Sequence, residues 1–111
     1  MKVIQSTEDW EREVVQSEVP VLVDFWAEWC APCRMLEPII EECERQFAGR
    51  VQVVKLNVDV LPEIADRHRV MSIPTVILFH RGEEVGRITG YQPRGTYLKH
   101  VERLLNSVEA R

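Results

Sequence analysis

The sequence predicts one α/β domain over residues 1–111, built on a central mixed β-sheet with helices on both faces. Segments with strand-like and helix-like apolar spacing alternate along most of the chain, which is typical of parallel strands joined by helices. Two further strand-like segments then follow each other across a short turn at residues 81–84, which predicts an antiparallel hairpin. The chain length fits one domain and is too short for two.

Five segments have the residue pattern of strands. Residues 21–27 are nearly all apolar, with β-branched and aromatic side chains, which indicates a strand buried on both faces of the sheet. Residues 51–58 alternate between apolar and polar side chains, as in a strand with one buried face. The expected strands are 3–4, 21–27, 51–58, 76–79 and 85–89.

Four segments have helical spacing. Ser6 can cap the first helix, with Asp9 placed to complete the cap, and residues 19–20 should end it. The second helix extends from Cys33 to the next glycine, and Pro62 suits the first turn of the third. The fourth helix carries an apolar stripe formed by Tyr97, Val101, Leu104, Leu105 and Val108.

The composition is that of a soluble globular protein, with 45% hydrophobic and 29% charged residues. A net charge of −4 argues against a nucleic-acid-binding surface, which usually carries a basic excess. No apolar run is long enough to span a membrane, and polar residues interrupt the N-terminal segment before a signal-peptide core could form. We therefore expect a cytoplasmic monomer that binds neither nucleic acid nor membranes.

The chemistry of the chain centres on a Cys-x-x-Cys motif where the second strand passes into the second helix. In the cytosol thiols are kept reduced, so a close cysteine pair there is catalytic or metal-binding rather than structural. Cys30 would lie at the helix N-terminus, where the helix dipole and free N–H groups stabilise a thiolate, so we expect it to be the nucleophile. Cys33, about one turn further on, can attack the resulting mixed disulfide and release the substrate. Pro32 stiffens the connection at little cost near a helix start.

A metal site is the alternative interpretation of the cysteine pair. Structural zinc usually needs four ligands, and the chain has no second Cys-x-x-Cys and no matching histidine pair. Cys43 lies about 15 Å from Cys33 along the same helix, so the two could not share one ion. We expect no metal and interpret Cys43 as an inert thiol on the apolar stripe of the helix. The glutamates of this helix should form a solvated face: Glu37, Glu41, Glu42 and Glu44.

Asp24 is the one charged residue in the apolar run at 21–27. One interpretation is a polar residue at the edge of the sheet. The other is a buried carboxyl near Cys33, whose pKa would rise towards neutrality because burial disfavours the charged form. A carboxyl with such a pKa suits a general base at pH 7, so we expect Asp24 to accept a proton during the reaction.

The segment VDFWAEWCAPCRM resembles the active-site segment of thioredoxins, and the resemblance extends over essentially the whole chain. It continues through KLNVD at residues 55–59, Ile73-Pro74-Thr75, Gly82 and Gly90. One departure is Ala31-Pro32 between the cysteines, where thioredoxins usually have Gly-Pro. Ala restricts the backbone more than Gly, which affects the redox potential and the shape of the substrate groove. The resemblance implies the thioredoxin fold, a central mixed five-stranded sheet flanked by four helices.

The same resemblance assigns roles to residues outside the cysteine motif. It supports Asp24 as proton acceptor and makes Lys55, on the neighbouring strand, its electrostatic partner. It also implies a cis peptide bond before Pro74, with the backbone of Ile73 pairing with an extended client segment. The expected substrate-binding surface consists of Trp29, Ala31, Pro32, Ile73, Pro74 and Gly90.

The function expected from these features is reduction of disulfides in client proteins through Cys30 and Cys33. The resemblance implies recharging by an NADPH-dependent thioredoxin reductase, and no bound cofactor other than the redox-active disulfide. Three alternatives stay open. A disulfide oxidant or isomerase would belong to an oxidising compartment, a non-catalytic binding subunit would tolerate loss of both thiols, and a metal or iron–sulfur carrier would show in its absorbance and metal content.

Overall fold

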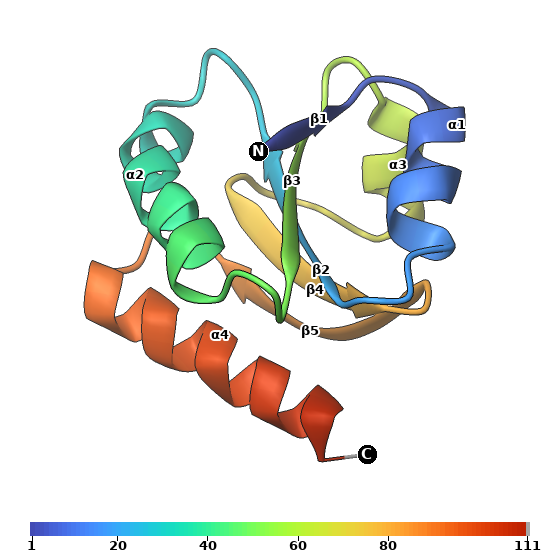
Figure 1. Ribbon diagram of the computed structural model, residues 1–111. Coiled ribbons are helices and arrows are strands. Elements are labelled where there is room, and N and C mark those ends of the chain that lie inside the picture. Colours follow the sequence, from blue (N-terminus) through green and yellow to red (C-terminus); the bar gives the residue numbers. More distant parts are fainter. Residues whose placement is uncertain (111) are drawn as a thin grey trace.

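The structure is a computed structural model that describes residues 1–110, and five of its segments form one mixed β-sheet (Figure 1). The strand order is β1-β3-β2-β4-β5, with β1 and β2 parallel to β3 and with β4 antiparallel to both β2 and β5. This arrangement confirms the predicted mixed sheet with its C-terminal hairpin. The strands are β1 (Lys2–Ile4), β2 (Val21–Trp26), β3 (Gln52–Asn57), β4 (Thr75–His80) and β5 (Glu83–Thr89).

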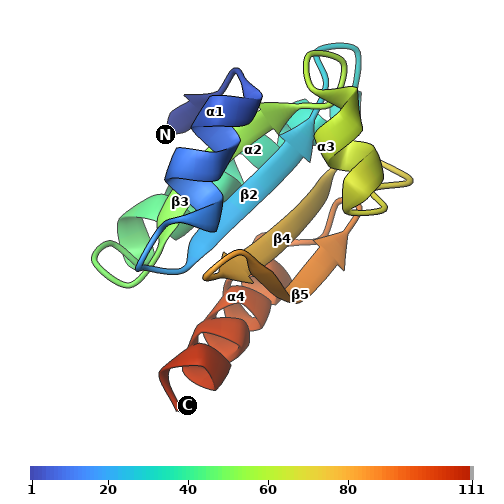
Figure 2. The same ribbon diagram turned by 90° about the vertical axis from the view of Figure 1, so that its right-hand side faces the viewer.

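Helices cover both faces of the sheet, as expected. In two perpendicular views, α2 and α4 lie on one face, and α1 and α3 lie on the other (Figures 1 and 2). Among the described residues, no helix combines the length and apolar character needed to cross a membrane. The helices are α1 (Thr7–Trp10) with its continuation η1 (Glu11–Val15), α2 (Ala31–Gln46), α3 (Pro62–Arg67) and α4 (Arg94–Glu109).

Strand β2 is central, and its residues are buried because β3 and β4 flank it and helices cover both of its faces. Side chains alternate between the two faces along a strand. Leu22 packs in the core beneath α2 and α4, whereas Val23 and Phe25 pack in the core beneath α1 and α3. Asp24, two residues after Leu22, therefore points into the α2/α4 layer, and so does Trp26 beyond it.

The first helix differs from its prediction at its C-terminal end. The predicted cap forms, with the Asp9 N–H donating to Ser6 Oγ at 3.0 Å and the Gln5 N–H donating to the Asp9 carboxylate at 3.0 Å. The helix then widens into the π-helical turn η1 and ends at Val15, about four residues earlier than expected. Val19, directly before Pro20, is restricted to extended geometry, so the helix could not continue up to Pro20.

The hairpin between β4 and β5 is tighter than the sequence predicts. Its turn consists of Arg81 and Gly82, which both have positive φ, 53° and 81°. Positive φ at both central residues is typical of a two-residue hairpin turn whose twist matches the strands. Strand β5 therefore begins at Glu83, two residues before the expected start.

Candidate active site

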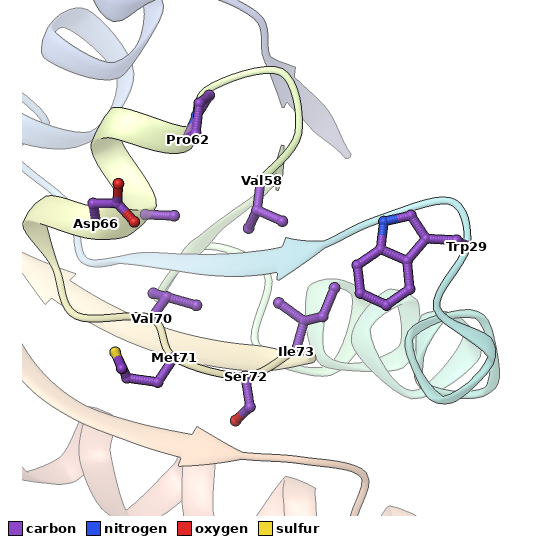
Figure 3. A pocket seen from close by; sticks show the side chains of 9 residues that line it. Trp29, Val58, Pro62, Asp66, Val70, Met71, Ser72 and Ile73 are labelled. Atoms are coloured by element: carbon purple, nitrogen blue, oxygen red, sulfur yellow. The ribbon is translucent and has the colours of Figure 1, made fainter.

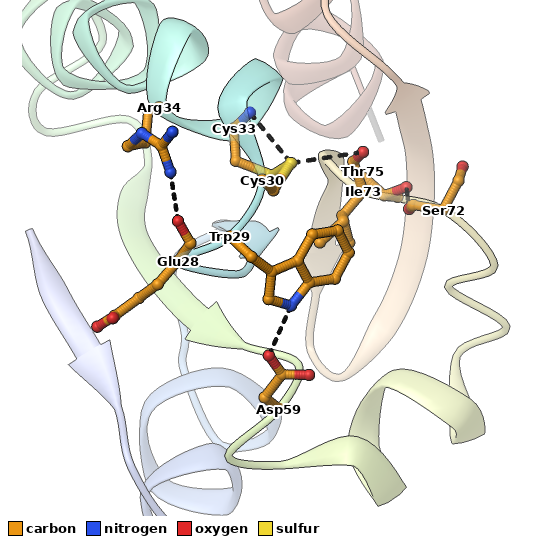
Figure 4. The surroundings of a disulfide bond; sticks show 9 residues. All are labelled: Glu28, Trp29, Cys30, Cys33, Arg34, Asp59, Ser72, Ile73 and Thr75. Carbon is orange, nitrogen blue, oxygen red and sulfur yellow. Dashed lines mark hydrogen bonds between the residues drawn. A yellow bond between two sulfur atoms is a disulfide. The ribbon is translucent and has the colours of Figure 1, made fainter.

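A disulfide joins Cys30 and Cys33 where β2 passes into α2, and their Cα atoms are 5.3 Å apart (Figure 4). Helix α2 begins at Ala31, two residues earlier than predicted, because Pro32 fits the first turn of a helix. Cys30 is the N-cap residue, and the Cys33 N–H points at Cys30 Sγ from 3.2 Å. After reduction, this N–H group and the positive end of the helix dipole would stabilise a thiolate on Cys30.

Both cysteines are nearly buried, with 4% of Cys30 and 3% of Cys33 exposed. Exposure in the disulfide form therefore does not separate the attacking cysteine from the resolving one. Their positions on the helix do, since Cys30 caps α2 and Cys33 is its third residue. The two cysteines cluster with Ala27 and with the partly buried side chains of Trp26 and Ile73.

The loop before β4 faces the disulfide. The peptide bond between Ile73 and Pro74 is cis in the structure, which is the isomer implied by the resemblance. Cys30 Sγ lies 3.8 Å from the carbonyl oxygen of Ile73 (Figure 4). The Pro74 carbonyl accepts the Gly90 N–H at 2.7 Å, which joins the loop before β4 to the residue that follows β5.

Trp29 stands at the rim of the site with 70% of its surface exposed. Its indole N–H donates to the carboxylate of Asp59 at 2.8 Å, which fixes an otherwise free ring (Figure 4). Asp59 lies just after β3 and is thirty residues away in the sequence. The sequence contains no spacing signal for this contact, and Asp59 carries no expected role in our sequence analysis.

A pocket of about 440 Å³ opens between Trp29 and α3 (Figure 3). It extends the expected binding surface towards α3 and towards Met71, which is 91% exposed. An exposed apolar side chain next to an apolar pocket is typical of a surface that binds other proteins. The pocket is lined by Trp29, Val58, Pro62, Ala65, Asp66, Val70, Met71, Ser72 and Ile73.

Asp24 is 2% exposed, so its interpretation as a residue at the edge of the sheet is wrong. Its side chain enters the α2/α4 layer, and within residues 1–110 its Oδ1 atom has no hydrogen-bond partner. Burial raises the pKa of this carboxyl to about 7; the positive charge of Lys55 lowers it, and the negative charge of Glu37 raises it further. A buried carboxyl that titrates near neutrality can hold or release a proton under ordinary conditions.

Lys55 lies opposite Asp24 in the β2–β3 register, but its ammonium group contacts other residues. Lys55 Nζ is 3.6 Å from Glu37 Oε2 and 4.1 Å from the ring centroid of Trp26. The expectation that Glu37 belongs to a solvated face needs correction, because this half-buried carboxylate is the ion-pair partner of Lys55. The sequence does not reveal this contact, because it depends on how α2 packs over β3.

Cys43 is fully buried on the inner side of α2, and burial raises the pKa of its thiol to about 11. A thiol of this kind is almost entirely protonated at neutral pH and reacts slowly. The glutamates near it include Glu42, which pairs with Arg94 of α4. Within residues 1–110, no cluster of three or more histidine, cysteine or acidic side chains has metal-binding geometry.

Comparison with known proteins assigns the chain to a family. The sequence model of the family described as Thioredoxin matches residues 1–103. The chain is 46% identical over 100 residues to thioredoxin M4, chloroplastic, of Arabidopsis thaliana, which covers 90% of this chain and 52% of that protein. It is 42% identical over 108 residues to thioredoxin M-type, chloroplastic, of Spinacia oleracea, which covers 96% of this chain and 60% of that protein. It is 43% identical over 96 residues to thioredoxin 1 of Nostoc sp., which covers 86% of this chain and 90% of that protein.

These matches agree with the structure. The chain spans between half and two thirds of the length of the two chloroplast relatives, and most of the length of the relative from Nostoc. The family match includes the strand that carries Asp24, the disulfide pair and the cis-proline loop. By its sequence and its fold, the chain belongs to the thioredoxin family.

Proposed function

We propose that this protein reduces disulfide bonds in client proteins through Cys30 and Cys33. The observation that carries the proposal is the disulfide itself, which caps the N-terminus of α2 and faces the carbonyl of Ile73. A disulfide at a helix N-terminus is readily exchanged, because the helix end stabilises the thiolate that leaves when the bond opens. Such a bond is suited to electron transfer rather than to stabilising the fold.

The reaction begins with the reduced pair. The Cys30 thiolate attacks one sulfur of a client disulfide, forms a mixed disulfide and releases the first client sulfur as a thiolate. Cys33 then gives its proton to Asp24 and attacks Cys30 Sγ. The second client sulfur leaves as a thiolate and takes up the proton held by Asp24, and the first client thiolate takes up a proton from the solvent. The client gains two electrons and two protons in total, and the Cys30–Cys33 disulfide forms again.

The surface around the cysteines supports binding of an extended client segment. The backbone of Ile73 borders the sulfur atoms and can pair with such a segment in the manner of an added strand. Ala31 and Pro32, which are exposed, and the partly exposed Gly90 complete the proposed surface. Trp29 and the pocket beside it provide apolar contacts that are independent of the client sequence.

We further propose a cytoplasmic monomer that an NADPH-dependent flavoprotein reductase recharges. Support comes from the similarity to bacterial thioredoxins, those of Nostoc sp. and Rickettsia bellii. The relatives named as chloroplastic make a second electron donor testable, a ferredoxin-dependent reductase. Each donor can be supplied separately to the same oxidised protein.

The test is a coupled turnover assay with a disulfide-containing client protein. We expect NADPH and a flavoprotein reductase to drive continuous client reduction, and the Cys30→Ser and Cys33→Ser variants to lose it. Equilibration with a redox buffer should place the pair on the reducing side, as befits a reductase rather than an oxidant or isomerase. Full activity after loss of both thiols would indicate a binding subunit and would contradict the proposal.

A further inference from the structure

Glu37 is a carboxylate close to the active site that takes no direct part in the proposed reaction. Glu37 lies on α2 four residues after Cys33 and contacts Lys55 of β3. Its Oε2 atom is 3.6 Å from Lys55 Nζ, and Lys55 is only 15% exposed. A charge pair with one largely buried member is more than an ordinary surface contact, since solvent screens it less.

The Lys55 ammonium group forms an ion pair with Glu37 and none with Asp24. The two residues are aligned across β2 and β3, so their side chains leave the same face of the sheet. Nevertheless, the Lys55 ammonium lies against Glu37 and above the ring of Trp26. Among the described residues, Asp24 Oδ1 has no hydrogen-bond donor, so Lys55 does not satisfy it.

Few charged or titratable groups surround Asp24. Lys55 approaches from β3 and Glu37 from α2, and both act on the carboxyl through their charge. Tyr97 of α4 is fully buried; burial raises the pKa of its hydroxyl group, and the charge of Asp24 raises it further. Val76 is the apolar neighbour of Asp24 from β4. Glu37 is therefore the one carboxylate that both influences Asp24 and contacts its nearest cation.

We propose that Glu37 is a positioning residue of the active site, which holds the Lys55 ammonium in an ion pair on the α2 side and thereby leaves the buried carboxyl of Asp24 without a contacting cation. This inference rests on the proposed function, in which Asp24 accepts the proton of Cys33. With Lys55 held by Glu37, Asp24 keeps a pKa near neutrality and is a strong enough base for that step. Without Glu37, Lys55 is free to pair with Asp24 and to make it a weaker base.

The experiment measures the titration of Asp24 directly, by NMR of its carboxyl carbon in the reduced full-length protein. Glu37→Gln removes the charge with almost no change in size. We expect it to lower the pH midpoint of Asp24 by about 0.5 unit or more. Glu41→Gln makes the same charge change one turn further along α2, at an exposed residue, and should leave the midpoint unchanged.

A second background separates positioning from a direct charge effect. In Lys55→Met, no ammonium remains to be positioned, so Glu37→Gln should shift the Asp24 midpoint by less than half as much as in the parent. An equal shift in both backgrounds would show that Glu37 acts only through its own charge and would overturn the proposal. No shift from Glu37→Gln in the parent would overturn it as well.

The same variants also connect the inference to the reaction. The pH at which resolution of the mixed disulfide is half-maximal should move down together with the Asp24 midpoint in Glu37→Gln. If the protein proved not to reduce disulfides, the NMR titration would still decide whether Glu37 positions Lys55. A titration shift with an unchanged resolution profile would instead show that Asp24 is not the base.

Discussion

Replacing Asp24 by Asn should make the protein more stable at neutral and alkaline pH. Asp24 is 2% exposed, and burial raises the pKa of its carboxyl from 3.8 to about 7 in the folded state. In the unfolded chain the carboxyl keeps its ordinary pKa. Folding therefore opposes ionisation, and the stability that is present below the unfolded pKa is lost as the pH rises through the folded pKa.

The magnitude follows from the two pKa values. Each pKa unit corresponds to about 1.4 kcal/mol, so the ionisation penalty at pH 8 amounts to about 4 kcal/mol of unfolding free energy. Asn cannot ionise, and its amide has nearly the shape of the protonated carboxyl. The difference in stability between Asp24→Asn and the parent should therefore grow by about 3–4 kcal/mol between pH 4 and pH 8.

Urea denaturation of the oxidised proteins at several pH values measures this difference. The slope of unfolding free energy against urea should be the same in both proteins, because the exposed surface does not change. Glu41→Gln, which removes a carboxylate from the solvent-exposed side of α2, should follow the parent at every pH. A stability difference that stays constant with pH, or that shrinks as the pH rises, would refute a buried carboxyl with a raised pKa.

Substitutions of Cys43 and Asp59 test two further features of the structure. Cys43→Ala should keep full turnover and cost about 1–2 kcal/mol of stability through lost packing, as judged by denaturation and a coupled assay. Because the pKa of the Cys43 thiol is about 11, a thiol reagent at pH 8 should modify Cys30 of the reduced protein at least about a hundredfold faster than it modifies Cys43. Equal rates at the two cysteines would place Cys43 outside the core. Asp59→Ala removes the acceptor, so it should loosen the Trp29 ring and raise KM for clients by about threefold to tenfold with little change in kcat. An unchanged Trp29 indole N–H resonance would count against this contact.

The features that the sequence predicted well are those encoded in neighbouring residues. The apolar run around Asp24 specifies a buried strand, because only a central position can accommodate so many apolar side chains in a row. The spacing of Cys30 and Cys33 at a strand-to-helix junction specifies the redox pair in the same local way. The cis bond before Pro74 is different, since it follows from the family resemblance and not from the general rarity of cis proline.

The features that were missed depend on how distant segments pack. The contact of Trp29 with Asp59 joins two loops, and the pocket beside Trp29 depends on the position of α3. The pairing of Glu37 with Lys55 requires α2 to lie across β3 at one particular angle. A glutamate with helical spacing is usually solvated, so its residue type alone did not reveal a partner. The first helix and its cap were predicted, and only its C-terminal end was misplaced, by about four residues.

The central claim is that Cys30 attacks the client and Cys33 resolves the intermediate, and trapping the mixed disulfide tests it most directly. Reduced Cys33→Ser and Cys30→Ser are each mixed with a disulfide-containing client, and the products are analysed by mass spectrometry. The position of Cys30 at the cap of α2 predicts a stable adduct through Cys30 in Cys33→Ser and almost none in Cys30→Ser. A stable adduct through Cys33 in Cys30→Ser, with none in Cys33→Ser, would reverse the two roles and contradict the mechanism.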